Sequence, residues 1–468
     1  MLARRVDKPT TMLAPLHLEV AMQRPVLFLL HSLGASHREW SAVQRALGDA
    51  FECVALDIPG FGGTIADGAT DINALVDRFQ QEVATRAPAC WFAVGHSMGG
   101  KIATLLAARS RDGVQGLAGL AGVILVAASP PCPEPMEEAR REKMLGWFAN
   151  GAPARVHAEA FIDANTHRPL QGATREVAIL DVLRTDPVAW RAWLQQGSRE
   201  HRQQEAAHLH TPALILAGAE DGDLGGAAQR ALNAPHYMHA SVEVVPHAAH
   251  LIPVEQPEWL AQRIAAWTLP LAARALPPAF IQLLNAERVA PRMRARLLAR
   301  HADPLPLPTS AMPARHLELL AALATCIVPG ADPNDLALRV GHALVDHESD
   351  GWRFADLPAD AEAWAQALDQ LDAAAHGFTK LAPAEQHALL VRVQQQSAST
   401  TDDAALDPVQ LAHWFEDARA LFARTWMSLP STWAAIGYDG FAVGGKGAQS
   451  PGYEHTEADM IDAWQLPC

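Results

Sequence analysis

Cysteine is scarce in this chain of 468 residues, and the arrangement of its few cysteines argues against a disulfide framework. They are odd in number, lie far apart and never form a Cys-x-x-Cys pair. That arrangement also argues against a cysteine-based metal site. Cys53 and Cys90 stand in apolar runs, so we expect buried free thiols. The full set is Cys53, Cys90, Cys132, Cys326 and Cys468.

Positive charge and long hydrophobic runs are also lacking. There are 37 Lys and Arg against 52 Asp and Glu, a formal net charge of −15, which argues against nucleic acid or an anionic membrane as the main partner. No apolar run is long enough to span a membrane. Because no apolar segment follows Arg4-Arg5, we expect no secretion signal and a cytoplasmic protein, with export through a partner left open.

Strands and helices alternate in the first half of the chain. Continuous apolar runs are typical of strands covered on both faces, and residues 16–20 alternate like an edge strand. Helical stretches near 40–47, 71–85 and 255–267 separate or follow these runs, which predicts a doubly wound, mostly parallel sheet within residues 1–270. The runs lie at residues 25–30, 51–56, 89–94, 122–127, 212–217 and 241–245.

The alternation is interrupted at about residues 130–210, where only helix-like pieces occur, and we interpret this segment as a helical cap over the strand ends. Its aromatic side chains predict either an apolar acyl or aryl pocket or simple packing of the cap on the core. The pieces are 136–149, 154–165, 176–185 and 188–196, and the aromatics are Trp147, Phe148, Phe161, Trp190 and Trp193.

Beyond residue 270 the composition changes. Proline-bearing stretches predict a linker at 271–310, and only helical periodicity follows, which predicts an all-α domain at 311–468. No glycine-rich phosphate loop is present, and His342 and His347 lack metal-ligand spacing, so we expect no cofactor and no metal. The predicted helices are 314–327, 336–346, 361–374, 384–395 and 408–427, before a glycine-rich tail at 436–453.

One stretch carries the chemistry of the first half. Gly95-His96-Ser97-Met98-Gly99 follows a buried strand and precedes an Ala/Leu-rich helix, which is typical of a nucleophile elbow. Glycines are required there because the turn is strained and brings the strand and helix backbones together. Ser97 would stand exposed at the strand tip, beside helix N–H groups that favour a developing oxyanion.

With four further motifs, residues 16–268 resemble the α/β-hydrolase superfamily. The resemblance implies Ser97 as nucleophile, His250 as general base and Asp221 as the acid that orients it, in the chain order of that superfamily. Asp223 and Glu220 remain less favoured substitutes for the acid, and His236, His239 and His247 are expected at the surface or behind the site. The motifs are His31-Ser-Leu-Gly34, Asp57-Ile-Pro-Gly-Phe-Gly62, Gly218-Ala-Glu-Asp221 and His250-Leu-Ile-Pro-Val-Glu-Gln-Pro257.

The resemblance also implies an oxyanion hole formed by the amides of Leu33 and Met98. Here Ser32 replaces the glycine that is commoner in the superfamily. We expect the turn around Asp57 to be structural. Because residue 97 is serine, the aspartate-nucleophile dehalogenases and epoxide hydrolases of this fold are disfavoured, which leaves ester, thioester, lactone or carbon–carbon hydrolysis and a perhydrolase side activity.

Residues 311–453 resemble the subunit 3 family of gluconate 2-dehydrogenase. The resemblance rests on the 320–330, 364–374, 381–386, 415–426 and 436–440 stretches, and it implies a helical partner of an FAD-dependent dehydrogenase of the glucose-methanol-choline type. We expect most of its tryptophans in a helical core and some as interface anchors. They are Trp352, Trp364, Trp414, Trp426 and Trp433.

The sequence therefore supports two alternative functions. The favoured one is a serine hydrolase that acts on a small ester or lactone and carries a helical partner-binding domain. The alternative is an accessory subunit of a flavoprotein dehydrogenase with a vestigial hydrolase domain. Labelling of the serine and co-purification of a flavoprotein distinguish them.

Overall fold

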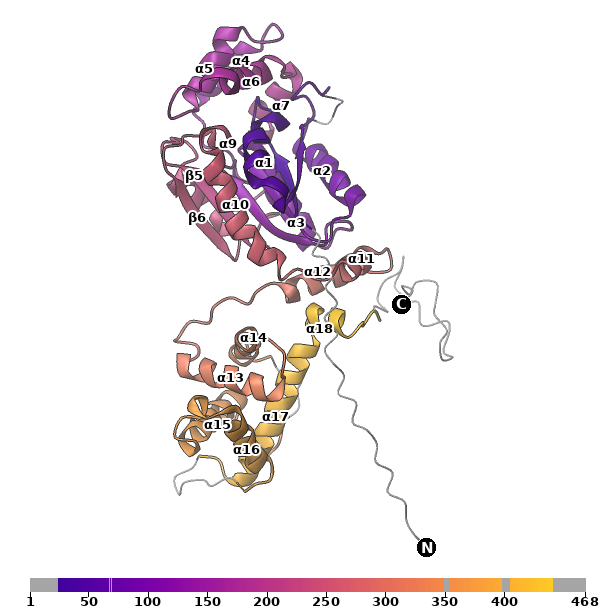
Figure 1. The fold of residues 1–468 in the computed structure, drawn as a ribbon, viewed down its shortest axis with the longest axis vertical. Helices are drawn as coiled ribbons and strands as arrows, with labels where there is room; N and C mark the ends of the chain where they lie inside the picture. Colours follow the sequence, from indigo (N-terminus) through magenta and orange to yellow (C-terminus); the bar gives the residue numbers. More distant parts are fainter. Residues whose placement is uncertain (1–23, 67, 69, 349–352, 398–404, 441–468) are drawn as a thin grey trace.

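The computed structural model describes residues 24–66, 68, 70–348, 353–397 and 405–440 (Figure 1). Several features predicted above lie outside these residues: the edge strand at 16–20, Arg4-Arg5, Trp352, Cys468 and most of the tail at 436–453. None of the helices within these ranges has the length and apolar character needed to cross a bilayer.

A sheet of six parallel strands forms the centre of the first half, in the order β2-β1-β3-β4-β5-β6. Neighbouring strands point the same way, so their carboxyl ends meet at one edge, where loops can gather functional side chains. The strands are β1 (Val26–Leu30), β2 (Glu52–Leu56), β3 (Trp91–His96), β4 (Leu120–Val126), β5 (Ala213–Gly218) and β6 (Ala240–Val245).

Helices cover both faces of this sheet, as a doubly wound fold requires (Figure 1). One face packs α2 and α3 onto side chains such as Phe28 and Trp91, and the other packs α1 and α10 onto Leu29 and Phe92. The predicted fold class is confirmed. The helices are α1 (Ser41–Leu47), α2 (Ile72–Arg86), α3 (Met98–Arg111), α8 (Gly226–Leu232), α9 (Ile252–Glu255) and α10 (Pro257–Ala272), with short 3-10 turns η1 (His37–Trp40), η2 (Gly48–Ala50) and η4 (Ala234–His236).

Four helices between β4 and β5 form a cap beyond the carboxyl ends of the strands (Figure 1). Part of the cap is held by aromatic packing: the rings of Phe148 and Trp190 stack with centroids 4.4 Å apart, and Phe161 meets Trp190 edge-on at 5.4 Å. The cap helices are α4 (Glu138–Trp147), α5 (Arg155–Ala164), α6 (Gly172–Leu183) and α7 (Pro187–Gln195), followed by η3 (Gly197–Arg199).

The segment at 271–310, expected as a linker, contains two helices, α11 (Pro278–Asn285) and α12 (Pro291–His301). They lie at the end of the sheet opposite the cap (Figure 1). The buried Arg294 guanidinium donates to the carbonyls of Gly113, Leu284 and Val289, so α12 is bound to the turn after α3. Proline at the start of each helix supplies a preset φ and lacks an N–H that would otherwise be unpaired.

The second half is helical throughout its described residues and has its own apolar core. Trp364 and Trp414 are buried there with rings 5.5 Å apart, whereas Trp426 and Trp433 are partly exposed. The helices are α13 (Ala314–Ile327), α14 (Pro333–Val345), α15 (Asp360–Ala374), η5 (Phe378–Lys380), α16 (Pro383–Gln394), α17 (Pro408–Met427) and α18 (Pro430–Ala435).

Candidate active site

Ser97 stands in a strained turn between β3 and α3. Its backbone has φ +50° and ψ −116°, a conformation that a non-glycine residue rarely adopts. The turn is close-packed: a Cβ on Gly95 would lie 2.3 Å from the Gly99 carbonyl oxygen, and one on Gly99 would lie 2.4 Å from that of Leu30. Only glycine fits at these two positions. The geometry of a nucleophile elbow is therefore present.

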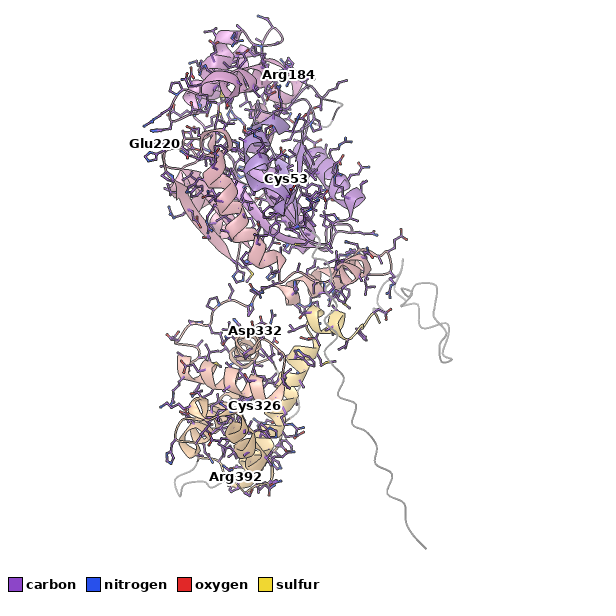
Figure 2. All side chains as sticks on the ribbon, in the orientation of Figure 1. Cys53, Arg184, Glu220, Cys326, Asp332 and Arg392 are labelled. Atoms are coloured by element: carbon purple, nitrogen blue, oxygen red, sulfur yellow. The ribbon has the colours of Figure 1, made fainter. Side chains whose placement is uncertain are left out.

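His250 and Asp221 form a half-buried pair on loops after β6 and β5. His250 Nδ1 lies 2.8 Å from Asp221 Oδ2, while Asp221 Oδ1 accepts from the amides of Asp223 and Leu224 at 3.2 and 3.1 Å. These bonds fix the carboxylate and leave His250 Nε2 as the free ring nitrogen. Asp223 instead pairs with Arg140 from the cap, and Glu220, labelled in Figure 2, is exposed.

Within the pair, each side chain stabilises the charged form of the other. Burial alone would lower the pKa of His250, but the charge and hydrogen bond of Asp221, with smaller contributions from Glu134 and Glu39, raise it. Burial alone would raise the pKa of Asp221, but His250 and the two backbone amides lower it. Asp221 is thus suited to remain an anion and to stabilise an imidazolium on His250.

Ser97, His250 and Asp221 line one cavity of about 190 Å³ beneath the cap. No hydrogen bond joins Ser97 Oγ to His250 within the described residues. In free enzymes such bonds are often long and tighten only when substrate binds. The cavity brings the three predicted catalytic residues together, whereas His236, His239 and His247 do not line it.

The two predicted oxyanion donors are also placed at this edge of the sheet. Leu33 follows β1 and lines the cavity, and Met98 opens α3 beside Ser97. Neither amide donates to an acceptor among the described residues. A buried N–H without a partner is uncommon, so these two amides are candidates for binding an oxygen of a ligand.

The turn at Asp57 is hydrogen-bonded to His31. The amide of Ile58 donates to His31 Nε2 at 3.0 Å, and His31 Nδ1 lies 2.7 Å from the carbonyl oxygen of Ser32. Burial lowers the pKa of His31, which suits a neutral ring that accepts at Nε2 and donates at Nδ1. This contact ties the turn to the loop that carries Leu33 and supports the structural role expected for it.

Two carboxyl groups of the site carry no motif in the sequence. Glu134 lines the cavity, accepts from Ser129 Oγ at 2.9 Å, and burial raises its pKa. Glu39 is not among the residues that line the cavity, and it contacts Ser32 and His96. Glu134 falls in a proline-rich stretch and Glu39 in a short 3-10 turn, so no periodicity or spacing marks either one.

The expectation of an aromatic pocket is met only in part. Phe161 and Trp193 line the cavity, together with Met136, Met144 and Leu224. Phe148 and Trp190 instead pack the cap, and Trp147 stacks on His157 with ring centroids 5.6 Å apart. Polar side chains from the cap, from the segment before it and from the loop after β5 supply the rest of the lining: Glu134, Arg140, Asn165, Glu220 and Asp223.

No group of three or more metal-ligating side chains is arranged to hold an ion in the part of the chain that the structure describes. The four described cysteines are free thiols. Burial raises the pKa of Cys53 and of Cys90 to about 11, so both are suited to remain protonated at neutral pH.

Comparison with known proteins gives two family matches. The model of the Alpha/beta hydrolase family matches residues 27–264, and that of gluconate 2-dehydrogenase subunit 3 matches residues 314–440. Both agree with the resemblances read from the motifs.

Curated relatives match only the first half. Biotin biosynthesis bifunctional protein BioHC of Cellvibrio japonicus is 29% identical over 247 residues, covering 51% of this chain and 46% of that protein. The 2-succinyl-6-hydroxy-2,4-cyclohexadiene-1-carboxylate synthase of Escherichia coli K12 is 29% identical over 119 residues, covering 25% and 44%. The chain thus spans less than half the length of these relatives.

Some solved structures are similar to the first half of the chain. An esterase from Thermogutta terrifontis has a TM-score of 0.46 and 24% identity, covering 53% of this chain and 90% of its own. The enol-lactonase of Burkholderia xenovorans LB400 has a TM-score of 0.45 and 20% identity, covering 53% and 93%.

Proposed function

We propose that this chain, which belongs to the alpha/beta hydrolase family, is a serine hydrolase that cleaves a carboxylic ester, a lactone or a related acyl bond. One observation carries the proposal: Ser97 stands at a strained elbow in the same cavity as His250, whose ring is paired with Asp221. A serine hydroxyl becomes a nucleophile when an oriented base removes its proton, and this arrangement supplies the base and its orienting group.

The reaction follows from the roles of these groups. Ser97 Oγ attacks the substrate carbonyl carbon while His250 Nε2 takes the hydroxyl proton, and Asp221 stabilises the resulting imidazolium. The amides of Leu33 and Met98 hold the oxyanion of the tetrahedral intermediate. Its collapse breaks the acyl–oxygen bond, and the leaving oxygen takes the proton from His250. Water then attacks the acyl-enzyme, again with His250 as base, and releases the acid and free Ser97.

The cavity supports a compact substrate with polar groups. Sulfur and aromatic side chains of Met136, Met144 and Phe161 offer apolar contact, while Glu134 and Arg140 offer hydrogen-bonding or charged contact. Arg140 is already paired with Asp223 and with Asn165 Oδ1, so it presents less net charge than a free guanidinium.

Labelling with a fluorophosphonate, read by intact mass, tests the proposal. We expect one adduct on the wild-type chain and none on Ser97→Ala, because the probe reacts only with an activated serine. Hydrolysis of p-nitrophenyl acetate and of simple lactones should be lost in the same variant. A wild-type chain that takes no adduct and hydrolyses neither probe would contradict the proposal.

The helical half favours a second candidate function, that of an accessory subunit of an FAD-dependent dehydrogenase. The family match over residues 314–440 supports a partner-binding role for this half. The two functions are compatible if the hydrolase domain cleaves a lactone that such a dehydrogenase forms. Co-purification of a flavoprotein that persists in Ser97→Ala would favour the accessory role. Its absence from pull-downs, or failure of the chain to cleave the partner's lactone, would contradict the coupling.

A further inference from the structure

The loop that carries Leu33 is bound to one buried carboxylate. The amide of Ser32 donates to Glu39 Oε2 at 3.2 Å, and Ser32 Oγ donates to Glu39 Oε1 at 2.8 Å. A glycine, the commoner residue at this position in the superfamily, could supply only the first of these bonds. The serine side chain therefore adds a second hydrogen bond between this loop and the η1 turn that carries Glu39.

The same carboxylate contacts the nucleophile elbow. His96 Nδ1 lies 2.9 Å from Glu39 Oε1, at ion-pair distance although not aligned as a hydrogen bond. On the other side of the ring, His96 Nε2 lies 2.8 Å from the carbonyl oxygen of His250, and the two rings are 5.2 Å apart. His96 immediately precedes Ser97 and is fully buried. It therefore connects Glu39 with both the nucleophile and the main chain of the base.

Glu39 is suited to remain an anion in this place. Burial alone would raise the pKa of its carboxyl group, but the close contact with His96 and the hydrogen bond from Ser32 lower it. Only 7% of Glu39 is exposed, so the anion depends on these partners rather than on water.

We propose that Glu39 is a positioning residue that holds the Ser32–Leu33 loop, the Ser97 elbow and the main chain of His250 in one arrangement, with Ser32 as its partner on the loop. The inference rests on the proposed function. One carboxylate contacts the neighbour of an oxyanion donor and the neighbour of the nucleophile, and it reaches the base through His96. Because a misplacement of about 1 Å at a reacting centre can cost about 10²-fold in rate, loss of this anchor should reduce turnover.

The anion should also influence the base electrostatically. The carboxylates that raise the pKa of His250 are Asp221, Glu134 and Glu39, in that order. Removal of the Glu39 charge, with Asp221 and Glu134 kept, should lower the pKa of His250 and move the acid limb of the kcat/KM profile to lower pH. A role limited to packing would leave that limb in place.

Three variants test the inference: Glu39→Gln, Ser32→Gly, and Glu416→Gln as a control at an exposed carboxylate of the helical half. Folding is checked by circular dichroism, and activity by kcat and KM for p-nitrophenyl acetate across pH. We expect Glu39→Gln to lower kcat by roughly 10–100-fold with KM changed less than about threefold, and to shift the acid limb to lower pH. Ser32→Gly should lower kcat less and leave the limb unshifted, and Glu416→Gln should match the wild type.

The outcomes separate this inference from the proposed function. If the wild type takes the fluorophosphonate adduct but Glu39→Gln keeps its kcat and its pH profile, the inference on Glu39 is wrong and the hydrolase proposal stands. If Glu39→Gln does not fold, Ser32→Gly decides, because it removes one bond without leaving a buried amide side chain: unchanged kcat would overturn the inference. A wild type without adduct and without hydrolysis would overturn both.

Discussion

Lys101 Nζ donates a hydrogen bond of 2.7 Å to the carbonyl oxygen of Gly197 and so joins the elbow helix to the end of the cap. The same ammonium group approaches the carbonyls of Glu200 at 3.3 Å and Cys132 at 3.4 Å. Cys132 precedes the cap and Glu200 follows it. Lys101, one helical turn after Ser97, therefore binds both ends of the cap segment to the helix that carries the nucleophile.

Replacement of this lysine should weaken the attachment of the cap. We expect Lys101→Met to lower the free energy of unfolding by about 2 kcal/mol, because buried carbonyls lose a charged donor. Urea unfolding measures this, with Lys143→Met as control at an exposed lysine of α4. Equal effects of the two substitutions would refute the role given to Lys101.

The same lysine predicts a pH-dependent stability. Burial lowers the pKa of Lys101 from 10.5 to about 8. As pH rises from about 8 to about 10.5, the folded chain releases this proton before the unfolded chain does, so the free energy of unfolding should rise, by up to about 3 kcal/mol. Lys101→Met lacks this contribution. The difference between wild type and variant, measured at pH 7 and pH 10, should therefore grow in favour of the wild type, and a constant difference would contradict the prediction.

The acid limb of catalysis should report His250. Its pKa is raised above 6.5 by Asp221, and attack by Ser97 requires the neutral ring, so kcat/KM should increase with pH to a plateau that begins above 6.5. In Asp221→Asn the limb should move to lower pH and kcat should fall by roughly 10³–10⁴-fold. Asp223→Asn is the matched control, two residues further along the same loop. The pH of its acid limb should stay unchanged, because Asp223 pairs with Arg140 and not with His250. A limb that moves in Asp223→Asn but not in Asp221→Asn would reverse the assignment.

The close approach at the elbow predicts a steric effect. Gly99→Ala would place a Cβ 2.4 Å from the carbonyl oxygen of Leu30, which is backbone and cannot move aside. We expect a loss of about 3 kcal/mol in the free energy of unfolding. Gly146→Ala, at an exposed position of α4 with nothing within 4 Å of the added carbon, should instead be neutral or slightly stabilising. Thermal unfolding of both variants decides, and a Gly99→Ala chain as stable as the wild type would refute the packing argument.

The attachment of α12 predicts another loss. Arg294 is buried and donates to carbonyls of the α3–β4 turn and of its own segment, so Arg294→Ala should lower the free energy of unfolding by about 3 kcal/mol and speed proteolysis between residues 277 and 313. Arg296→Ala, at an exposed position on the same helix, is the control. Indistinguishable proteolysis of the two variants would show that α12 is held by other contacts.

Features that depend on neighbouring residues could be predicted from the amino-acid sequence. Apolar runs predicted strands, their alternation with helices predicted the parallel sheet, and both predictions of fold are confirmed. Residues 314–327 and 408–427 were expected as helices with the bounds that α13 and α17 have. The elbow could also be predicted, because the need for glycine beside Ser97 is a local steric requirement.

Contacts between groups far apart in the chain depend on how the elements pack in three dimensions. Asp221, Asp223 and Glu220 are near-neighbours in sequence, and the pairing of Asp221 with His250 and of Asp223 with Arg140 depends on where β6 and the cap bring their partners. The helices within 271–310 were not expected, because their prolines suggested a linker and their packing surface belongs to the other end of the sheet. The places of Glu39 and Glu134 in the site could not be predicted either. A buried carboxylate is stabilised by partners elsewhere in the chain, and such contacts produce no repeating pattern in the sequence.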